Sequence, residues 1–360
     1  MKSSLVRWIV GAIAIVVILG VLRARPWQRS GADTTARQSA GAAAGGATVP
    51  EAERETLAVG YLPVTCHLTC PVTDFASKTS HHTRFESQRF TDFPTVVETL
   101  KSGRLQATFM IAPLAMKLRE QGVKVKIAYL GHRDGSTVMV RSDLPAKSLK
   151  DLEGRSFALP SKYSNQNLVI RKLMKDQGVD ASKIRFVEMP PPDMPGALAA
   201  KAIDAYFIGE PHAARAELDG TGRILYHAKD IWPRFISCVL VVTEDLIAKR
   251  PAVVKDLVRG IAESGEWAES HRLEAARLVS PYFRQDEKLV RHVLTQPPDR
   301  VSYRMLTPGD EEMQRMADMA YEAKILDTRL DVRGLVDRSF IPADIEAAHI
   351  DMPPVSATQP

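Results

Sequence analysis

Two stretches of the sequence, LKSGRLQATFMIAP at residues 100–113 and LAAKAIDAYFIGEP at residues 198–211, share one pattern. In each stretch a helix end leads into an apolar strand, and a proline stands where the next helix would begin. The matching positions, at a common offset of 98 residues, are Leu100/Leu198, Leu105/Ile203, Ala107/Ala205, Phe109/Phe207 and Pro113/Pro211. The pattern indicates two related α/β units. Chance similarity between two helix–strand units of similar composition is the alternative.

The sequence around these stretches alternates short apolar runs with helical patterns. The expected strands are 57–62, 85–90, 107–111, 125–130, 137–140, 157–159, 184–187, 205–208 and 235–243. Helices are expected at 95–100, around Val169, at 194–201 and from Glu244 onward. Such alternation predicts an α/β fold with mainly parallel sheets covered by helices. In open α/β sheets ligands bind beyond the carboxyl ends of the strands, so both proline-marked turns should face one shared cleft.

Composition limits the class of protein. The chain has 360 residues, of which 45% are hydrophobic and 25% charged, which excludes global disorder and a polytopic membrane protein. The net charge of +5 falls largely in the first 56 residues, where seven Lys or Arg stand against four Asp or Glu. The remainder is nearly neutral, and we expect no nucleic-acid partner.

The amino terminus reads as a membrane signal. Lys2 and Arg7 precede an uncharged stretch of 15 residues, WIVGAIAIVVILGVL at 8–22. No small-residue cleavage site follows directly, which favours an uncleaved signal anchor at 1–23 over a cleaved signal peptide. Residues 24–56 are rich in Ala and Gly and predict a flexible linker.

Five motifs follow one another between residue 57 and about 340: LAVGYLP at 57–63, LQATFMIAPLA at 105–115, LKDLEGR at 149–155, PPPDMPGAL at 190–198 and IDAYFIGEP at 203–211. Their order resembles that of the substrate-binding proteins of ABC transporters, in the group for nitrate, sulfonate, taurine and bicarbonate. Thiamine-pyrimidine binding and synthesis proteins are related to that group.

The resemblance implies a two-lobed periplasmic-binding-protein fold of type II that closes on a small ligand by a hinge. Residues 57–143 and 237–345 would form lobe 1, residues 144–236 lobe 2, and residues 346–360 a loose tail. The chain would cross between lobes near 140–148 and again near 235–242.

The pockets of such proteins use the turns at the strand ends, the helix start in lobe 2 and the return crossing. By resemblance the ligand-binding residues here are Thr65, Cys66, His67, Cys70, Ala112, Pro113, Ser164, Asn165, Gln166, Glu210, His212 and Cys238. The alternative to ligand contact for Asn165 and its neighbours is that they cap the helix or are ordinary polar surface residues. The alternative for Glu210 is that it caps the following helix. Arg133 and Lys162 are candidate partners for an anion.

The turn TCHLTCP at 65–71 departs from the usual pattern of that group. Thiolate and imidazole suit soft metals, so Cys66, His67 and Cys70 form a speculative metal site, with His132 and His212 within reach. A disulfide between Cys66 and Cys70, or between one of them and Cys238, is a second reading. Inert packing of small apolar side chains is a third.

These observations together predict the solute-binding component of an ABC-type importer. It would be a monomer with no cofactor beyond a possible metal, anchored by residues 8–22 outside the cytoplasmic membrane. It would capture a small anionic or thiophilic ligand without catalysis and deliver it to an ABC permease. The alternatives are an enzyme like the thiamine-pyrimidine synthases and a membrane-tethered ligand sensor.

Overall fold

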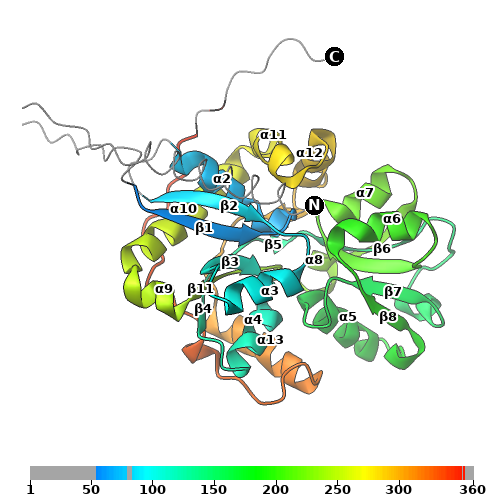
Figure 1. The fold of residues 1–360 in the computed structure, drawn as a ribbon. Helices are drawn as coiled ribbons and strands as arrows, with labels where there is room; N and C mark the ends of the chain where they lie inside the picture. The colour runs from blue at the N-terminus through cyan, green and yellow to red at the C-terminus, as the bar shows by residue number, and fades with distance from the viewer. Residues whose placement is uncertain (1–53, 79–82, 351, 353–360) are drawn as a thin grey trace, which may run out of the picture. The chain divides into compact units, whose positions relative to one another are not determined.

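The computed structural model describes residues 54–78, 83–350 and 352 (Figure 1). The expected anchor at 1–23 and most of the expected linker at 24–56 lie outside these residues. Within the described part, no helix combines the length and the apolar character needed to cross a membrane.

The first large sheet has the strand order β2-β1-β3-β11-β4. β1 pairs in parallel with β2 and with β3, while β11 runs antiparallel to both β3 and β4. Its strands are β1 (Thr56–Tyr61), β2 (Arg84–Arg89), β3 (Ala107–Met110), β4 (Val125–Leu130) and β11 (Val239–Thr243).

The second large sheet has the order β10-β6-β9-β7-β8, which repeats the arrangement of the first when read from the other edge. β7 pairs in parallel with β8 and β9, and β6 runs antiparallel to β9 and β10. Its strands are β6 (Ser136–Arg141), β7 (Ser156–Leu159), β8 (Arg185–Glu188), β9 (Ala205–Gly209) and β10 (Gly222–His227). β3 and β9, the strands of the two matching sequence stretches, hold equivalent places in the two sheets.

Helices cover both sheets (Figure 1). The helices that come before residue 136 or after residue 235 in the chain are α2 (Thr69–Ser77), α3 (Phe93–Lys101), α4 (Ala112–Glu120), α9 (Glu244–Lys249), α10 (Pro251–Ser270), α11 (Arg272–Phe283), α12 (Glu287–Thr295) and α13 (Asp310–Glu322). The second sheet carries α5 (Asn165–Asp176), α6 (Met194–Ala199), α7 (His212–Leu218) and α8 (Ala228–Ile231). Short 3-10 turns are η2 (Thr65–His67), η3 (Leu149–Leu152), η4 (Ala181–Lys183), η5 (Pro191–Asp193) and η6 (Val332–Gly334).

We call residues 54–78, 83–134 and 236–350 the first lobe, and residues 135–235 the second lobe. A small sheet of β5 (Arg133–Asp134) and β12 (Val301–Ser302) lies at the crossing between them. Strand alternation builds the second lobe's core: Val138 and Val140 of β6 face one apolar cluster, while Met139 faces another on the opposite side of the sheet.

Three features of the chain path differ from the sequence-based expectation. β6 belongs to the second sheet, so the first crossing lies before Ser136 and not at 140–148. The run expected as a strand at 235–243 becomes regular only at Val239, because its first residues form the return crossing. Part of the expected loose tail at 346–360 is packed: Ala348 donates its N–H to the Glu263 carbonyl at 3.0 Å, and Ala348 and Ile350 lie against the first lobe's core.

Candidate functional site

Turns at the carboxyl ends of β1 and β9 meet between the two lobes. The Thr65 N–H, which follows β1, donates to the Glu210 carbonyl, which follows β9, at 2.6 Å. Leu168 of α5 and Ala214 of α7 also pack into the apolar cluster of the first lobe. The turns after β1 and β9 therefore touch across the junction of the two lobes.

The turn after β1 is buried and held from several sides. Thr65, Cys66 and His67 form η2 and are at most 3% exposed. The Thr65 hydroxyl lies 2.8 Å from His132 Nε2, and the Thr65 carbonyl accepts from the Tyr303 hydroxyl at 2.9 Å. The His67 ring stacks on Phe109 with 5.3 Å between centroids. A turn fixed this firmly presents its side chains in one arrangement.

Asn165 connects the two lobes through the first turn of α5. Its side-chain amide donates to the Ile236 carbonyl and, at 3.3 Å, to the Ser237 carbonyl of the return crossing. The helix begins there because Ser164 is its N-cap, accepting the Asn167 N–H at 3.1 Å. Asn165 thus joins α5 to the return crossing, whereas Ser164 performs the capping that the sequence had left open.

Glu210 is a fully buried carboxylate of the second lobe. It accepts from the Thr137 hydroxyl and from the Ala214 N–H, each at 2.9 Å. Arg300 Nε, from the first lobe, lies 3.6 Å from its Oε1, and Arg300 Nη2 donates to Glu217 at 2.6 Å. Burial raises the pKa of Glu210, and the Arg300 charge and these hydrogen bonds oppose that shift. Glu210 therefore caps α7 and also faces a cation across the lobes.

Several buried polar atoms between the lobes have no hydrogen-bond partner within the described residues. The first lobe contributes His67 Nε2, His132 Nδ1 and Ser237 Oγ, and the second contributes Asn165 Oδ1, Gln166 Oε1 and His212 Nε2. All six side chains are at most 3% exposed. Burying an unpaired polar group costs about 1–3 kcal/mol, so such a concentration marks a place where a bound molecule would complete the pairing.

Two of the three cysteines meet at this place. Cys66 Sγ and Cys238 Sγ lie 2.9 Å apart, and both side chains are 3% exposed. Together with His67 they form the group, among the described His, Cys, Asp and Glu residues, whose ligand atoms lie within 4.8 Å of one another. Cys70 is separate, because α2 carries its sulfur toward the Val59 carbonyl and Ser87, at 3.6 and 3.7 Å. The metal site expected at Cys66, His67 and Cys70 is thus not assembled with Cys70.

The protonation of the cluster follows from its contacts. The Leu62 backbone N–H donates to His67 Nδ1 at 2.7 Å, so the neutral ring carries its proton on Nε2. Burial opposes ionisation of Cys66, but the hydrogen bond with Cys238 and the adjacent His67 hold the pKa of Cys66 well below its usual value. Burial and the Cys66 partner raise the pKa of Cys238. The two thiols therefore titrate as one coupled pair, with pKa shifts of opposite direction.

Burial also lowers the pKa values of two other imidazoles, those of His132 and His212, to about 4. Both rings are neutral at neutral pH. Ala112 and Pro113 are buried at the start of α4, where they contribute backbone and apolar surface. Arg133 is not free for an anion, since it forms a bidentate pair with Glu312 at 2.8 and 3.0 Å, and Lys162 is exposed.

Tyr303, Thr137 and Arg300 contact the site but were not predicted from the sequence. Tyr303 and Arg300 lie in the irregular segment between α12 and α13, which no motif marks as close to the first turn. A long-range contact of this kind becomes visible only in the folded chain.

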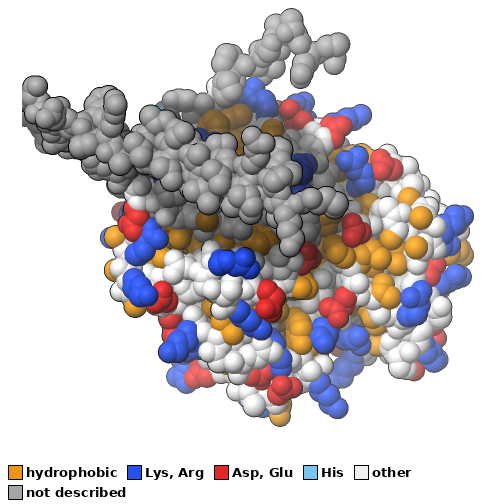
Figure 2. Space-filling model, in the orientation of Figure 1, with side chains coloured by type: hydrophobic (Ala, Val, Ile, Leu, Met, Phe, Trp, Pro, Cys, Tyr) orange, Lys and Arg blue, Asp and Glu red, His pale blue; other side chains and the backbone are white. Residues whose placement is uncertain are grey.

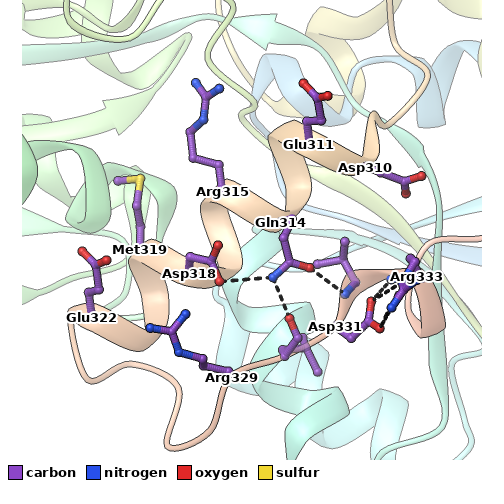
Figure 3. Close-up of a pocket in the computed structure, with 12 residues that line it drawn as sticks. Asp310, Glu311, Gln314, Arg315, Asp318, Met319, Glu322, Arg329, Asp331 and Arg333 are labelled. Atoms are coloured by element: carbon purple, nitrogen blue, oxygen red, sulfur yellow. Dashed lines mark hydrogen bonds and ion pairs between the residues drawn. The ribbon is translucent and has the colours of Figure 1, made fainter.

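Among the described residues, further hollows lie on the first lobe or at its border. One of about 940 Å³ is formed by α13 and the segment leading to η6 (Figure 3). Gln314 spans it, donating to the Leu330 carbonyl at 2.9 Å and accepting from the Val332 N–H at 3.2 Å, so its central polar groups are already paired. Another, of about 620 Å³, adjoins the return crossing at Ile236 and is walled by the Arg133–Glu312 pair. Neither contains the cysteine cluster.

The fold and the shared turns define the class as a periplasmic-binding-protein-like α/β protein. The chain belongs to the NMT1-like family, whose model matches residues 50–280. It is 21% identical over 267 residues to a putative aliphatic sulfonates-binding protein of Escherichia coli, covering 71% of this chain and 79% of that protein.

Two further comparisons extend this result. The nitrate import ATP-binding protein of Synechocystis is 26% identical over 195 residues, which is 49% of this chain but only 29% of that relative. A ligand-binding component of an ABC-type import system from Staphylococcus aureus, solved with zinc bound, superimposes with a TM-score of 0.73 at 24% identity, covering 80% of this chain and 98% of that one. The resemblance to the nitrate and sulfonate group is confirmed, and these relatives support a solute-binding role.

Proposed function

We propose that this chain is the solute-binding component of an ABC-type import system and holds a small solute between its two lobes. One observation carries the proposal: unpartnered polar atoms, buried in the described structure, converge on the lobe junction from both sides. A solute there would bond to the first turn and to α5 together. It would therefore stabilise the closed arrangement over the open one.

The available donors describe the kind of solute that fits. Arg133 and Arg300 are both engaged with carboxylates, so an anion would be held by neutral donors such as His67 Nε2–H and by the amino-terminal end of α5. Soft groups would meet Cys66 and Cys238. A small anion of low charge density and a thiophilic ligand are both compatible with this lining.

The proposal also includes the location of the protein at the membrane. The apolar stretch at 8–22 would anchor the chain outside the cytoplasmic membrane, and the segment after it would let the lobes reach an ABC permease. The chain would act as a non-catalytic monomer. Figure 2 shows Lys and Arg side chains interspersed with Asp and Glu on the part of this face that the structure describes.

A thermal-unfolding panel on the full-length chain tests the function. Nitrate, bicarbonate, an aliphatic sulfonate and a pyrimidine would be added separately, with and without reductant. A solute at 100 times its dissociation constant should stabilise the folded state by about 2.7 kcal/mol, and X-ray scattering should report closure with the same solute. A chain that neither shifts nor closes with any solute of these classes would refute the proposal.

A further inference from the structure

The buried cluster of Cys66, Cys238 and His67 is the strongest unassigned chemical feature of the lobe junction. Its two sulfurs come from segments 172 residues apart in sequence, the turn after β1 and the return crossing. Gly131 of the first crossing packs on both, donating its N–H to the Cys238 carbonyl at 2.8 Å. An added Cβ at Gly131 would lie 2.0 Å from the Cys66 carbonyl oxygen. The pair is thus fixed by three segments of backbone.

We infer that Cys66 and Cys238 bind one soft monovalent metal cation, Cu(I), as a two-thiolate site beside the hinge. The inference rests on the proposed function only in identifying this junction as the place where a ligand is captured. It names a thiophilic metal ion as that ligand's class.

The donor set selects a soft ion of low coordination number. The group contains two sulfurs and, among the residues the structure describes, no carboxylate. Zn²⁺ in proteins is almost always four-coordinate, and two thiolates leave half of its positions unfilled. His67 does not supply a third ligand, because its Nδ1 accepts the Leu62 N–H and its Nε2 carries the proton. Thiolate ligands favour Cu(I), which the two sulfurs alone can serve.

The charge and proton balance of binding can be written directly. Cu(I) displaces the thiol protons of the two cysteines: Cu⁺ + 2 RSH gives [RS–Cu–SR]⁻ + 2 H⁺, with no change in oxidation state. The sulfurs must separate from 2.9 Å, since two metal–sulfur bonds of roughly 2.3 Å each span at most about 4.6 Å. The unpartnered His67 Nε2–H is the donor available to the resulting negative charge.

An anaerobic competition titration of the full-length chain tests the inference, with Cu(I) as the metal and a chromogenic Cu(I) chelator as competitor. Wild type should take up one Cu(I) per chain. C66S and C238S should each lower the Cu(I) affinity by roughly 100-fold or more, because loss of a ligand exceeds the 10–100-fold effect of losing an outer hydrogen-bond partner. C70S is the matched control and should bind as wild type does.

Three outcomes would overturn the inference. The first is equal Cu(I) binding by C66S and wild type. The second is Zn²⁺ binding as tight as Cu(I) binding at the same two residues. The third is recovery of the pair, by peptide mapping of freshly isolated protein, as a Cys66–Cys238 disulfide that takes up no Cu(I).

The same experiment separates this inference from the proposed function. If wild type binds no Cu(I), yet a C66S/C238S variant is stabilised and closed by a small solute, the metal site is wrong and the solute-binding role stands. If Cu(I) binds through the two cysteines but neither Cu(I) nor any solute changes the scattering profile, the metal site stands and the solute-binding role fails.

Discussion

Gly131 shows how closely single residues are fitted around the thiol pair. A Cβ built there would meet the Cys66 carbonyl oxygen at 2.0 Å and the Cys238 carbonyl oxygen at 3.4 Å. Both obstacles are backbone atoms, so neither can rotate away. The residue is glycine because two other segments cross within van der Waals contact of it.

Gly131→Ala should therefore lower the free energy of unfolding by about 1–3 kcal/mol or more, through displaced backbone. Gly196→Ala is the control, since a Cβ at that helical position meets nothing within 4 Å and alanine favours a helix by about 0.5–1 kcal/mol. Urea unfolding of both variants measures the difference. A Gly131→Ala variant as stable as wild type would contradict the close crossing.

His132 makes stability depend on pH. Burial lowers its pKa to about 4 from an ordinary value of 6.5, so between these values the unfolded chain binds more protons than the folded one. The contribution of His132 to the free energy of unfolding is fully present above pH 6.5 and is lost as the pH falls toward 4. At pH 5 the loss should be on the order of 2 kcal/mol.

His132→Gln tests this, because glutamine can still bond to Thr65 but does not titrate. Urea unfolding at pH 7.5 and pH 5 should show a smaller acid-induced loss in the variant than in wild type. Asp134 and Glu210, whose burial raises their pKa values, act in the opposite sense in both proteins and cancel in the comparison. Identical slopes for wild type and variant would show that His132 is not held neutral.

The cysteines show what the sequence can and cannot predict at this scale. Family resemblance placed Cys66 and Cys238 at the site, and they do meet there. Cys70 was assigned to the same cluster because it is close in sequence. The direction of its side chain depends on where α2 begins, at Thr69, and the helix turns the sulfur toward β1 and β2. The spacing of the residues in this turn does not predict the direction in which the Cys70 side chain points.

At the scale of elements, α5 carries the connection between the lobes. Asn165 and Asn167 lie in the same first turn, but their amides bond differently: Asn165 reaches Ile236 and Ser237 of the crossing, and Asn167 reaches the Lys162 carbonyl at 2.7 Å within its own lobe. The two positions are therefore a natural matched pair.

Asn165→Ala should weaken solute binding by roughly 10-fold, the value of one to two net hydrogen bonds that join the lobes, and should shift scattering toward the open form. Asn167→Ala should lose a similar bond from the helix start without changing affinity. Isothermal titration with the solute identified in the panel provides the measurement. Equal losses in both variants would mean that α5 contributes only its own stability.

Element order was the most predictable level of the fold. Residues 107–111 and 205–208 share a pattern, and β3 and β9 occupy equivalent positions in two sheets of matching order. The crossings were less predictable, since Ser136–Arg141 reads as the same kind of apolar strand in either sheet. Its partners β9 and β10 come much later in the chain, and strand pairing over that distance has no local signal.

At the scale of the whole molecule, the junction of the lobes holds a carboxylate and a guanidinium from different lobes, both buried. Glu210 is 0% and Arg300 2% exposed. Their closest atoms are 3.6 Å apart, and Arg300 Nε and Nη1 have no hydrogen-bond partner among the residues that the structure describes. Such a pair adds little net stability by itself, but removal of one member leaves the charge of the other buried without its partner.

Arg300→Met should therefore cost on the order of 3–5 kcal/mol, and adding Glu210→Gln should recover part of that loss. The change in stability between pH 5 and pH 8 shows whether Glu210 carries the unpaired charge. Without Arg300 the pKa of Glu210 rises further above its unfolded value, so the stability of the single variant should be better preserved at pH 5 than at pH 8, and the double variant should lack this difference. A double-mutant cycle by urea unfolding at both pH values measures the coupling. Strict additivity at pH 8 would mean that Glu210 and Arg300 do not interact across the lobes, and closure would then rest on α5 and the first turn alone.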